Sequence, residues 1–172
     1  MTSSVYKIAL LIMCCVLIGA CGYQWVGKET HVPQGVNSIA IPTFINQTYE
    51  PEIEIFFTQA FLRQFIQDRR VRVVSRGEAD SVLEGIIKDF TFSVVSFDRS
   101  GIAKEYQTTV TVDLTLKKGT GEVLWREKNL SEKRWYRASS DAQTNEANKA
   151  AAIQQIGRFM AERIRNRFYS NF

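Results

Sequence analysis

The sequence predicts an α+β fold, a two-layer sandwich in which two helices pack on one face of a mostly antiparallel sheet of four to five strands. Two segments, which begin at residues 51 and 141, carry apolar residues at helical spacing. Between them, residues 81–136 read as consecutive strands separated by turn signals. Helices that are segregated from such strands along the chain typically gather on one face of an antiparallel sheet.

The clearest strand pattern lies at residues 106–117, where side chains alternate strictly between two faces. This alternation indicates a strand with one face in the core and one face in water. The preceding strand, 81–97, is too long to be flat, and we expect it to bend near Asp89. In the last strand, 122–136, the alternation slips between Trp125 and Leu130, which predicts a β-bulge. The core-facing row of the clearest strand is Tyr106, Thr108, Val110, Val112, Leu114 and Leu116.

The two predicted helices have recognisable starts and apolar stripes. Pro51 suits a first helical turn, because its fixed φ is helical and its missing N–H is not needed there. We expect the cations after Asp68 to close this helix near the negative end of its dipole. Asp141 is the predicted N-cap of the second helix. The stripes are Ile53, Phe57, Phe61 and Phe65 in the first helix, and Ile153, Ile156, Met160 and Ile164 in the second.

Shorter elements complete the predicted domain. Residues 37–42 are expected to form a strand that Pro42 ends, and residues 43–49 a loop. Residues 71–75 are expected to form a further strand, followed by a turn at 76–80.

The N-terminus predicts export and lipidation. Lys7 is followed by about eleven apolar residues, a run of about 17 Å that is too short for a hydrocarbon core of roughly 30 Å. The segment Ile18-Gly19-Ala20-Cys21 resembles the bacterial lipobox, so we expect a signal peptide at 1–20 and covalent lipid on Cys21. A lipidated tether at 21–35 then leads to a single domain at 36–172. Gly22 follows the cysteine, which predicts the outer membrane, on its periplasmic side, as the destination.

Composition and motifs argue against catalysis and against a metal site. The chain has 22 basic and 18 acidic side chains, with a single histidine and three cysteines, too few for an ordinary zinc site. The histidine, His31, lies in the predicted tether, and no GxSxG, HExxH, P-loop or GxGxxG motif is present. We therefore expect no enzyme activity and no cofactor. An exported lipoprotein also meets no genome, so the mild positive charge does not predict a nucleic-acid partner.

Two basic features are candidate binding sites. The turn after Phe97 places Arg99 and Lys104 at the tip of a hairpin, and Arg137 ends a basic and aromatic cluster that begins at Arg134. Arginine matches phosphate with two parallel hydrogen bonds, whereas lysine supplies a point charge. Solvated loop charges next to an interface-seeking aromatic are the alternative interpretation of both features.

A set of short motifs runs in order along the chain: Cys21-Gly22-Tyr23, Ile39-Ala40-Ile41-Pro42, Asn46-Gln47-Thr48, Glu78-Ala79-Asp80, Arg99-x-Gly101 with Ala103-x-Glu105-Tyr106-Gln107, and Asn145-Glu146. Through these motifs the chain resembles the lipopolysaccharide-assembly lipoprotein family, LptE. The resemblance implies two helices on a four-stranded sheet, no catalysis, and an outer-membrane lipoprotein that sits inside the β-barrel LptD, assists its assembly and binds lipopolysaccharide. It also implies that Arg99 binds lipopolysaccharide, because Arg99 occupies the family's basic position before the Glu-Tyr-Gln motif. Gln143 stands where the family has a second basic residue, and Lys104 or Arg137 could substitute for it.

Two other functions remain open at this point. A lipoprotein activator of a periplasmic cell-wall synthase, with the fold of curli-secretion lipoproteins, would share the opening strand Ile39–Phe44 and the helix after Asn46. That fold continues into alternating strands and helices, whereas residues 81–136 read as consecutive strands. A purely structural lipoprotein is the third interpretation.

Overall fold

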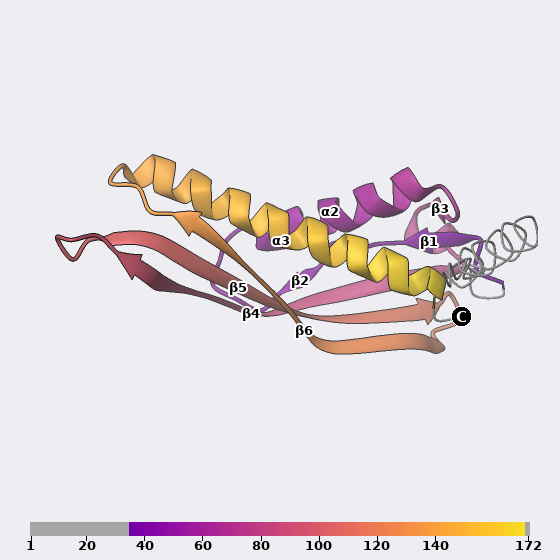
Figure 1. The fold of residues 1–172 in the computed structure, drawn as a ribbon. Coiled ribbons are helices and arrows are strands. Elements are labelled where there is room, and N and C mark those ends of the chain that lie inside the picture. The colour runs from indigo at the N-terminus through magenta and orange to yellow at the C-terminus, as the bar shows by residue number, and fades with distance from the viewer. Residues whose placement is uncertain (1–34, 171–172) are drawn as a thin grey trace, which may run out of the picture.

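Three long antiparallel strands form most of the sheet in the computed structural model, which describes residues 35–170 (Figure 1). They are β4 (Ser81–Phe97), β5 (Ala103–Lys118) and β6 (Val123–Arg137). Three short strands run parallel to their neighbours at the other side of the sheet: β1 (Ser38–Ala40), β2 (Ile45–Asn46) and β3 (Arg72–Val73). The order is β3-β1-β4-β5-β6, and β2 also pairs with β4.

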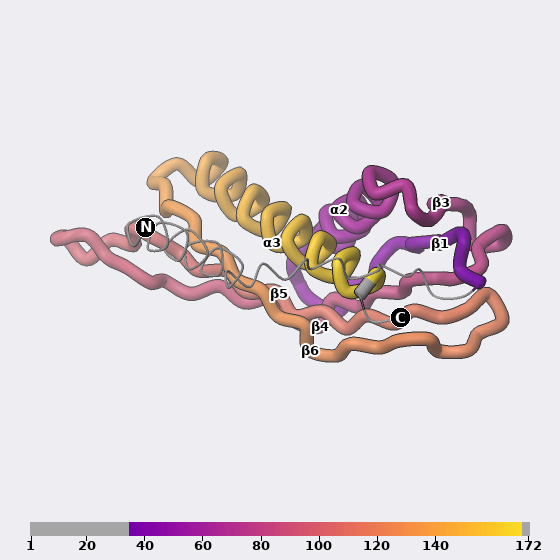
Figure 2. The backbone as a smooth tube through the Cα atoms, turned by 45° about the vertical axis from the view of Figure 1, so that its right-hand side comes forward, coloured from indigo at the N-terminus to yellow at the C-terminus, as the bar shows by residue number. Residues whose placement is uncertain are grey.

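Both α-helices of the described part cover the same face of this sheet, as Figures 1 and 2 show. They are α2 (Ile53–Asp68) and α3 (Ala142–Ser170), and a short 3-10 helix, η1 (Arg76–Glu78), precedes β4. The predicted α+β class is confirmed, with six strands instead of four to five. The additional strand is β2, which lies inside the segment expected to be a loop. Its two residues are too few to produce a sequence period.

The core lies between the two helical stripes and the inner row of β5. Val110, Val112, Leu114 and Leu116 are completely buried, so the predicted row faces the core over this length. The α2 stripe Ile53, Phe57, Phe61 and Phe65 is equally inaccessible, and Ile153, Ile156, Met160 and Ile164 of α3 are buried against it. Burial of these side chains is the main source of stability in the described domain, at about 1.5–3 kcal/mol for each large apolar residue.

The predicted irregularities of the strands are present. The pairing of β4 with β5 shifts register between Ile87 and Asp89, where we expected a bend. The pairing of β5 with β6 shifts register between Glu127 and Leu130, inside the segment where a β-bulge was expected. Asn129, within this shift, adopts a φ of 55°. The Asn129 N–H donates to Asp113 Oδ1 at 2.7 Å, which satisfies the backbone group that the bulge removes from the ladder.

The helix ends agree with the sequence at one position and differ at two. α2 begins at Ile53 instead of Pro51, after Glu52 at a φ of 61°. Asp141 caps α3 as expected, because its Oδ2 accepts the Thr144 N–H at 2.7 Å. The cations after Asp68 do not occupy the last turn of α2. Arg69 instead ends the helix in the left-handed region, at φ 62°. Arg70 turns back, donates to Asp68 Oδ2 at 2.7 Å and lies 3.6 Å from the Tyr169 ring centroid. This ion pair lowers the pKa of Asp68, and the contact of Arg70 with the Tyr169 ring joins the ends of the two helices.

A close contact between Gly85 and Phe44 generates a stability prediction. A Cβ at Gly85 would lie 2.3 Å from the Phe44 ring, which is buried and packs 5.0 Å from the Phe61 ring. Gly85→Ala should therefore lower the free energy of unfolding by about 1–3 kcal/mol, the usual cost of overpacking a core. Gly77→Ala is the control, because its Cβ would meet nothing within 4 Å. Equal urea midpoints for the two variants would contradict this packing.

Candidate functional site at the tip of the sheet

The turn between β4 and β5 is held in one conformation by Asp98. Its Oδ1 accepts the N–H groups of Ser100 at 2.7 Å and Ile102 at 2.9 Å, and Gly101 adopts a φ of 79° that favours glycine. Arg99 is exposed at the apex of this turn, and among the described residues it has no hydrogen-bonding or ionic partner. A rigid turn thus presents an uncompensated guanidinium to solvent.

The other two predicted basic residues meet beside this turn. Glu105 of β5 pairs with Arg137 of β6, and the Ala138 N–H donates to the Lys104 carbonyl at 3.0 Å. Together these segments form a shallow hollow of about 430 Å³, lined by Asp98, Ala103, Lys104, Glu105, Arg137 and Ala138. Lys104 and Arg137 therefore line the same hollow. Arg99 does not line it, but it directly follows Asp98, which does.

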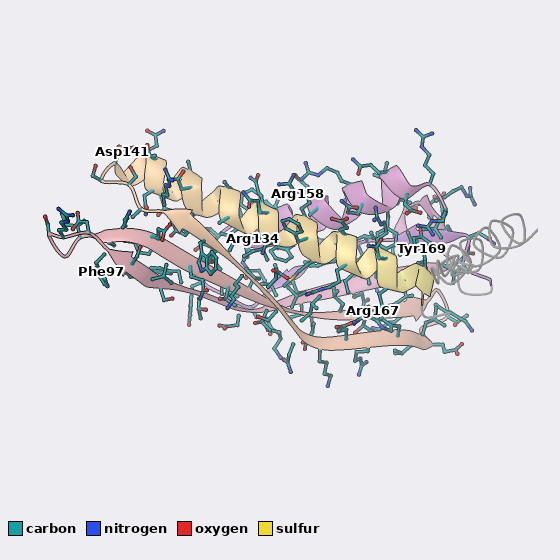
Figure 3. All side chains as sticks on the ribbon, viewed as in Figure 1. Phe97, Arg134, Asp141, Arg158, Arg167 and Tyr169 are labelled. Atoms are coloured by element: carbon teal, nitrogen blue, oxygen red, sulfur yellow. The ribbon has the colours of Figure 1, made fainter. Side chains whose placement is uncertain are left out.

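The predicted basic and aromatic cluster of β6 divides between two faces of the sheet. Arg134 points toward α3, where its guanidinium lies 4.1 Å from the Phe159 ring centroid and donates to Glu132 at 2.8 Å (Figure 3). Trp135 points the opposite way and donates through Nε1 to Gln107 at 2.9 Å. Arg137 reaches the hollow, so only the last part of the cluster belongs to the candidate site.

Apolar side chains surround these cations at the same end of the sheet. Phe97 projects from this end in Figure 3 and is 62% exposed, and Trp135 is 66% exposed. Below them, the Tyr106 and Tyr136 rings stack at 5.3 Å and support the strands. We call this region the tip and define it as residues 92–107 with 135–138. Its exposed apolar residues are Phe92, Val94, Val95, Phe97, Ile102 and Trp135.

The tip combines an apolar surface with three cations, which is the chemistry that an amphiphile with an anionic headgroup needs. Sequence reasoning identified the cations but missed most of the apolar surface, because alternating apolar residues in a strand ordinarily indicate a core. The available signal was length: strands of 15–17 residues span at least about 50 Å, twice the roughly 24 Å of α2. In the described part of the chain, no cluster of three metal-ligating side chains occurs, and no helix is long and apolar enough to cross a membrane.

Comparison with known families decides the identity of the domain. The family model described as lipopolysaccharide-assembly, LptE, matches residues 36–168. The chain belongs to the LptE family. No curated protein sequence matches the chain.

Solved structures share the fold of this LptE-family chain at low sequence identity. Rare lipoprotein B from Shewanella oneidensis is 17% identical, with a TM-score of 0.54 over 78% of this chain and 95% of that one. An uncharacterized lipoprotein B from Nitrosomonas europaea is 12% identical, with a TM-score of 0.56 over 87% and 91% of the two chains. Hypothetical protein CT253 from Chlamydia trachomatis is 8% identical, with a TM-score of 0.54 over 79% and 99%.

Several LptE-like motif residues are structural in this chain. Asp80 Oδ2 accepts the N–H groups of Asn37 and Ser38 and the Ser38 hydroxyl, all within 2.9 Å, and joins the starts of β1 and β4. These bonds, led by the one from the Ser38 hydroxyl, hold the pKa of Asp80 below its usual range. Asn46 Nδ2 donates to the Glu50 carbonyl and to Glu54, which fixes the entry into α2.

Two further predictions meet different outcomes. Gln143 lies exposed in the first turn of α3, which Figure 1 shows at the same end of the molecule as the tip. The position at which the resemblance implies a second basic residue therefore lies at the same end of the molecule as the candidate site, and it is uncharged here. The predicted signal peptide at 1–20, Cys21, His31 and most of the predicted tether at 21–35 lie outside the described residues. Lipidation of Cys21 stays a prediction.

Proposed function

We propose that this LptE-family chain is an outer-membrane lipoprotein, anchored on the periplasmic side through lipid on Cys21, that binds lipopolysaccharide at the tip. The observation that carries the proposal is the amphiphilic tip. Arg99, Lys104 and Arg137 match the phosphates of lipid A or core sugars, and the exposed apolar residues beside them match its acyl chains. The role is one of binding and delivery, without catalysis and without a cofactor.

We further propose that the domain plugs and helps to assemble an LptD-type β-barrel during delivery of lipopolysaccharide to the outer leaflet. Family membership supports this partner. The polar face of the sheet also supports it, because side chains that line the lumen of a large barrel are polar as well. The consecutive antiparallel strands β4, β5 and β6 favour this role over that of a cell-wall synthase activator, whose expected fold alternates strands and helices.

The charge of Arg99 generates the first functional prediction. An exposed charge contact contributes about 1 kcal/mol, so Arg99→Ala should weaken lipopolysaccharide binding about fivefold at low salt. The effect should shrink as ionic strength rises, because salt screens exposed charges. Binding can be measured by titration of the purified full-length lipoprotein with lipopolysaccharide, and circular dichroism should show an unchanged fold.

Arg158→Ala is the matched control for Arg99→Ala. Arg158 is an exposed cation on the outer side of α3, far from the tip in Figure 3, so its loss changes the net charge equally. Unchanged binding by Arg99→Ala at low salt, or an equal loss in both variants, would contradict the assignment of Arg99.

The partner is tested by purification of the tagged lipoprotein from its native envelope in mild detergent, followed by mass spectrometry. We expect a stoichiometric LptD-type barrel. Recovery of a cell-wall synthase without a barrel would instead favour the activator function, and recovery of neither would reject both.

A further inference from the structure

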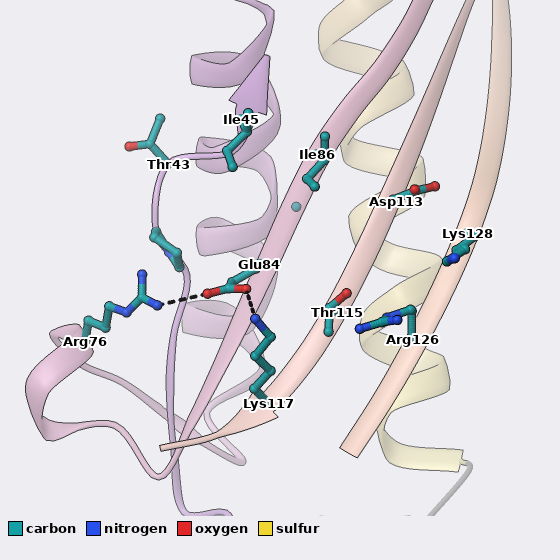
Figure 4. Close-up of a pocket in the computed structure, with 12 residues that line it drawn as sticks. Thr43, Ile45, Arg76, Glu84, Ile86, Asp113, Thr115, Lys117, Arg126 and Lys128 are labelled. Atoms are coloured by element: carbon teal, nitrogen blue, oxygen red, sulfur yellow. Dashed lines mark hydrogen bonds and ion pairs between the residues drawn. The ribbon is translucent and has the colours of Figure 1, made fainter. Parts of the chain in front are cut away.

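A second concave site lies on the face of the sheet that the helices leave open, at the end opposite the tip (Figure 4). It is a groove of about 470 Å³ between the β1–β2 segment and the strands β4, β5 and β6. Its strand residues alternate with buried ones: Glu84 follows Leu83, and Thr115 lies between Leu114 and Leu116. Ile86, which lines the groove, is six residues from Phe92, the first residue of the tip, so at about 3.3 Å per residue the two sites lie about 20 Å apart along β4. We call it the sheet-face groove.

The carboxylates of the sheet-face groove are already engaged by internal partners. Glu84 accepts hydrogen bonds from Arg76 Nη2 at 2.9 Å and from Lys117 Nζ at 2.6 Å, as Figure 4 shows. The bond from Lys117, with the charge of Arg76, lowers the pKa of Glu84 and keeps it ionised. Asp113 accepts the Asn129 N–H and lies 3.6 Å from Lys88 Nζ.

Two cations of the same groove have no such partner. Arg126 and Lys128 occupy alternate positions of β6 and line the groove beside Thr115 and Asp113 (Figure 4). Among the described residues, neither side chain makes a hydrogen bond or an ion pair. Glu127 between them faces the helices and pairs with Arg167. The groove therefore holds four cations against two carboxylates, and its two uncompensated charges stand together on one strand.

We propose that the sheet-face groove binds an acidic segment of the barrel partner, with carboxylates paired to Arg126 and Lys128. This inference rests on the proposed function, which places the open sheet face against a protein wall. Charge complementarity favours a carboxylate-bearing peptide, because two uncompensated cations at alternate positions of one strand match carboxylates spaced along an extended segment. Three apolar residues, Pro42, Ile45 and Ile86, also line the groove.

The charge reversal Arg126→Glu/Lys128→Glu tests this proposal in the full-length lipoprotein, purified from its native envelope. Close charge pairs across interfaces couple strongly, so we expect recovery of the barrel to fall about tenfold. Arg63→Glu/Arg158→Glu is the matched control: it makes the same change in net charge on the outer surface of the helices and should alter recovery less than twofold. Equal recovery with the groove variant and the wild type would overturn the proposal.

A photoreactive amino acid at position 128 identifies the occupant directly. We expect a crosslink to a partner peptide that contains Asp or Glu. Changing that acidic residue to Lys should restore recovery with Lys128→Glu, which a misfolded variant could not show. A crosslink only to lipopolysaccharide, or failure of this rescue, would overturn the proposal.

The recovery experiment distinguishes failure of the groove proposal from failure of the proposed function. If the wild type and the groove variant recover a barrel equally, only the groove proposal fails. If the wild type recovers no barrel, the proposed function fails as well.

Discussion

The packing of two helical stripes on the inner row of β5 is the interaction on which the rest of the structure depends. Val110 to Leu116 form a floor that α2 and α3 cover from one side. The sixteen residues of β5 span about 50 Å, whereas the sixteen of α2 span about 24 Å and the twenty-nine of α3 about 44 Å. Only α3 therefore extends toward the tip, and a single helix does not cover the full width of the sheet there (Figure 1). The distal ends of β4 and β5 are left exposed, and apolar residues there become a surface instead of a core.

This constraint separates the functional surfaces from the stabilising core. The tip collects Arg99, Lys104 and Arg137 with exposed aromatic side chains, whereas the sheet-face groove near the start of β4 is polar and charged. A domain that must hold an amphiphile and also contact a polar partner can use the two ends for the two tasks. Substitutions at one end should then leave the other end unchanged, because additive effects are expected for distant sites.

The sequence predicted those elements correctly in which the apolar residues repeat at helical or strand spacing over several turns or strand positions. The stripes of α2 and α3, the inner row of β5, the bend at Asp89 and the Asp141 cap all follow from local patterns. The two-residue strand β2 has no period, and the left-handed end of α2 at Arg69 depends on the pairing of Arg70 with Asp68 and Tyr169. The sheet-face groove could not be predicted, because it depends on how the strands pair: Thr115 of β5 lies between Glu84 of β4 and Arg126 of β6.

The central claim is that the tip is the end of the molecule that binds lipopolysaccharide. Hydrogen–deuterium exchange of the full-length lipoprotein, with and without lipopolysaccharide at low salt, tests it most directly. Strand ends with few buried contacts open locally, and a bound ligand suppresses such opening. We expect slower exchange in residues 92–107 and 135–138, with α2 and residues 123–128 of β6 unchanged. Slower exchange confined to the helices or to residues 123–128, with the tip unaffected, would contradict the account.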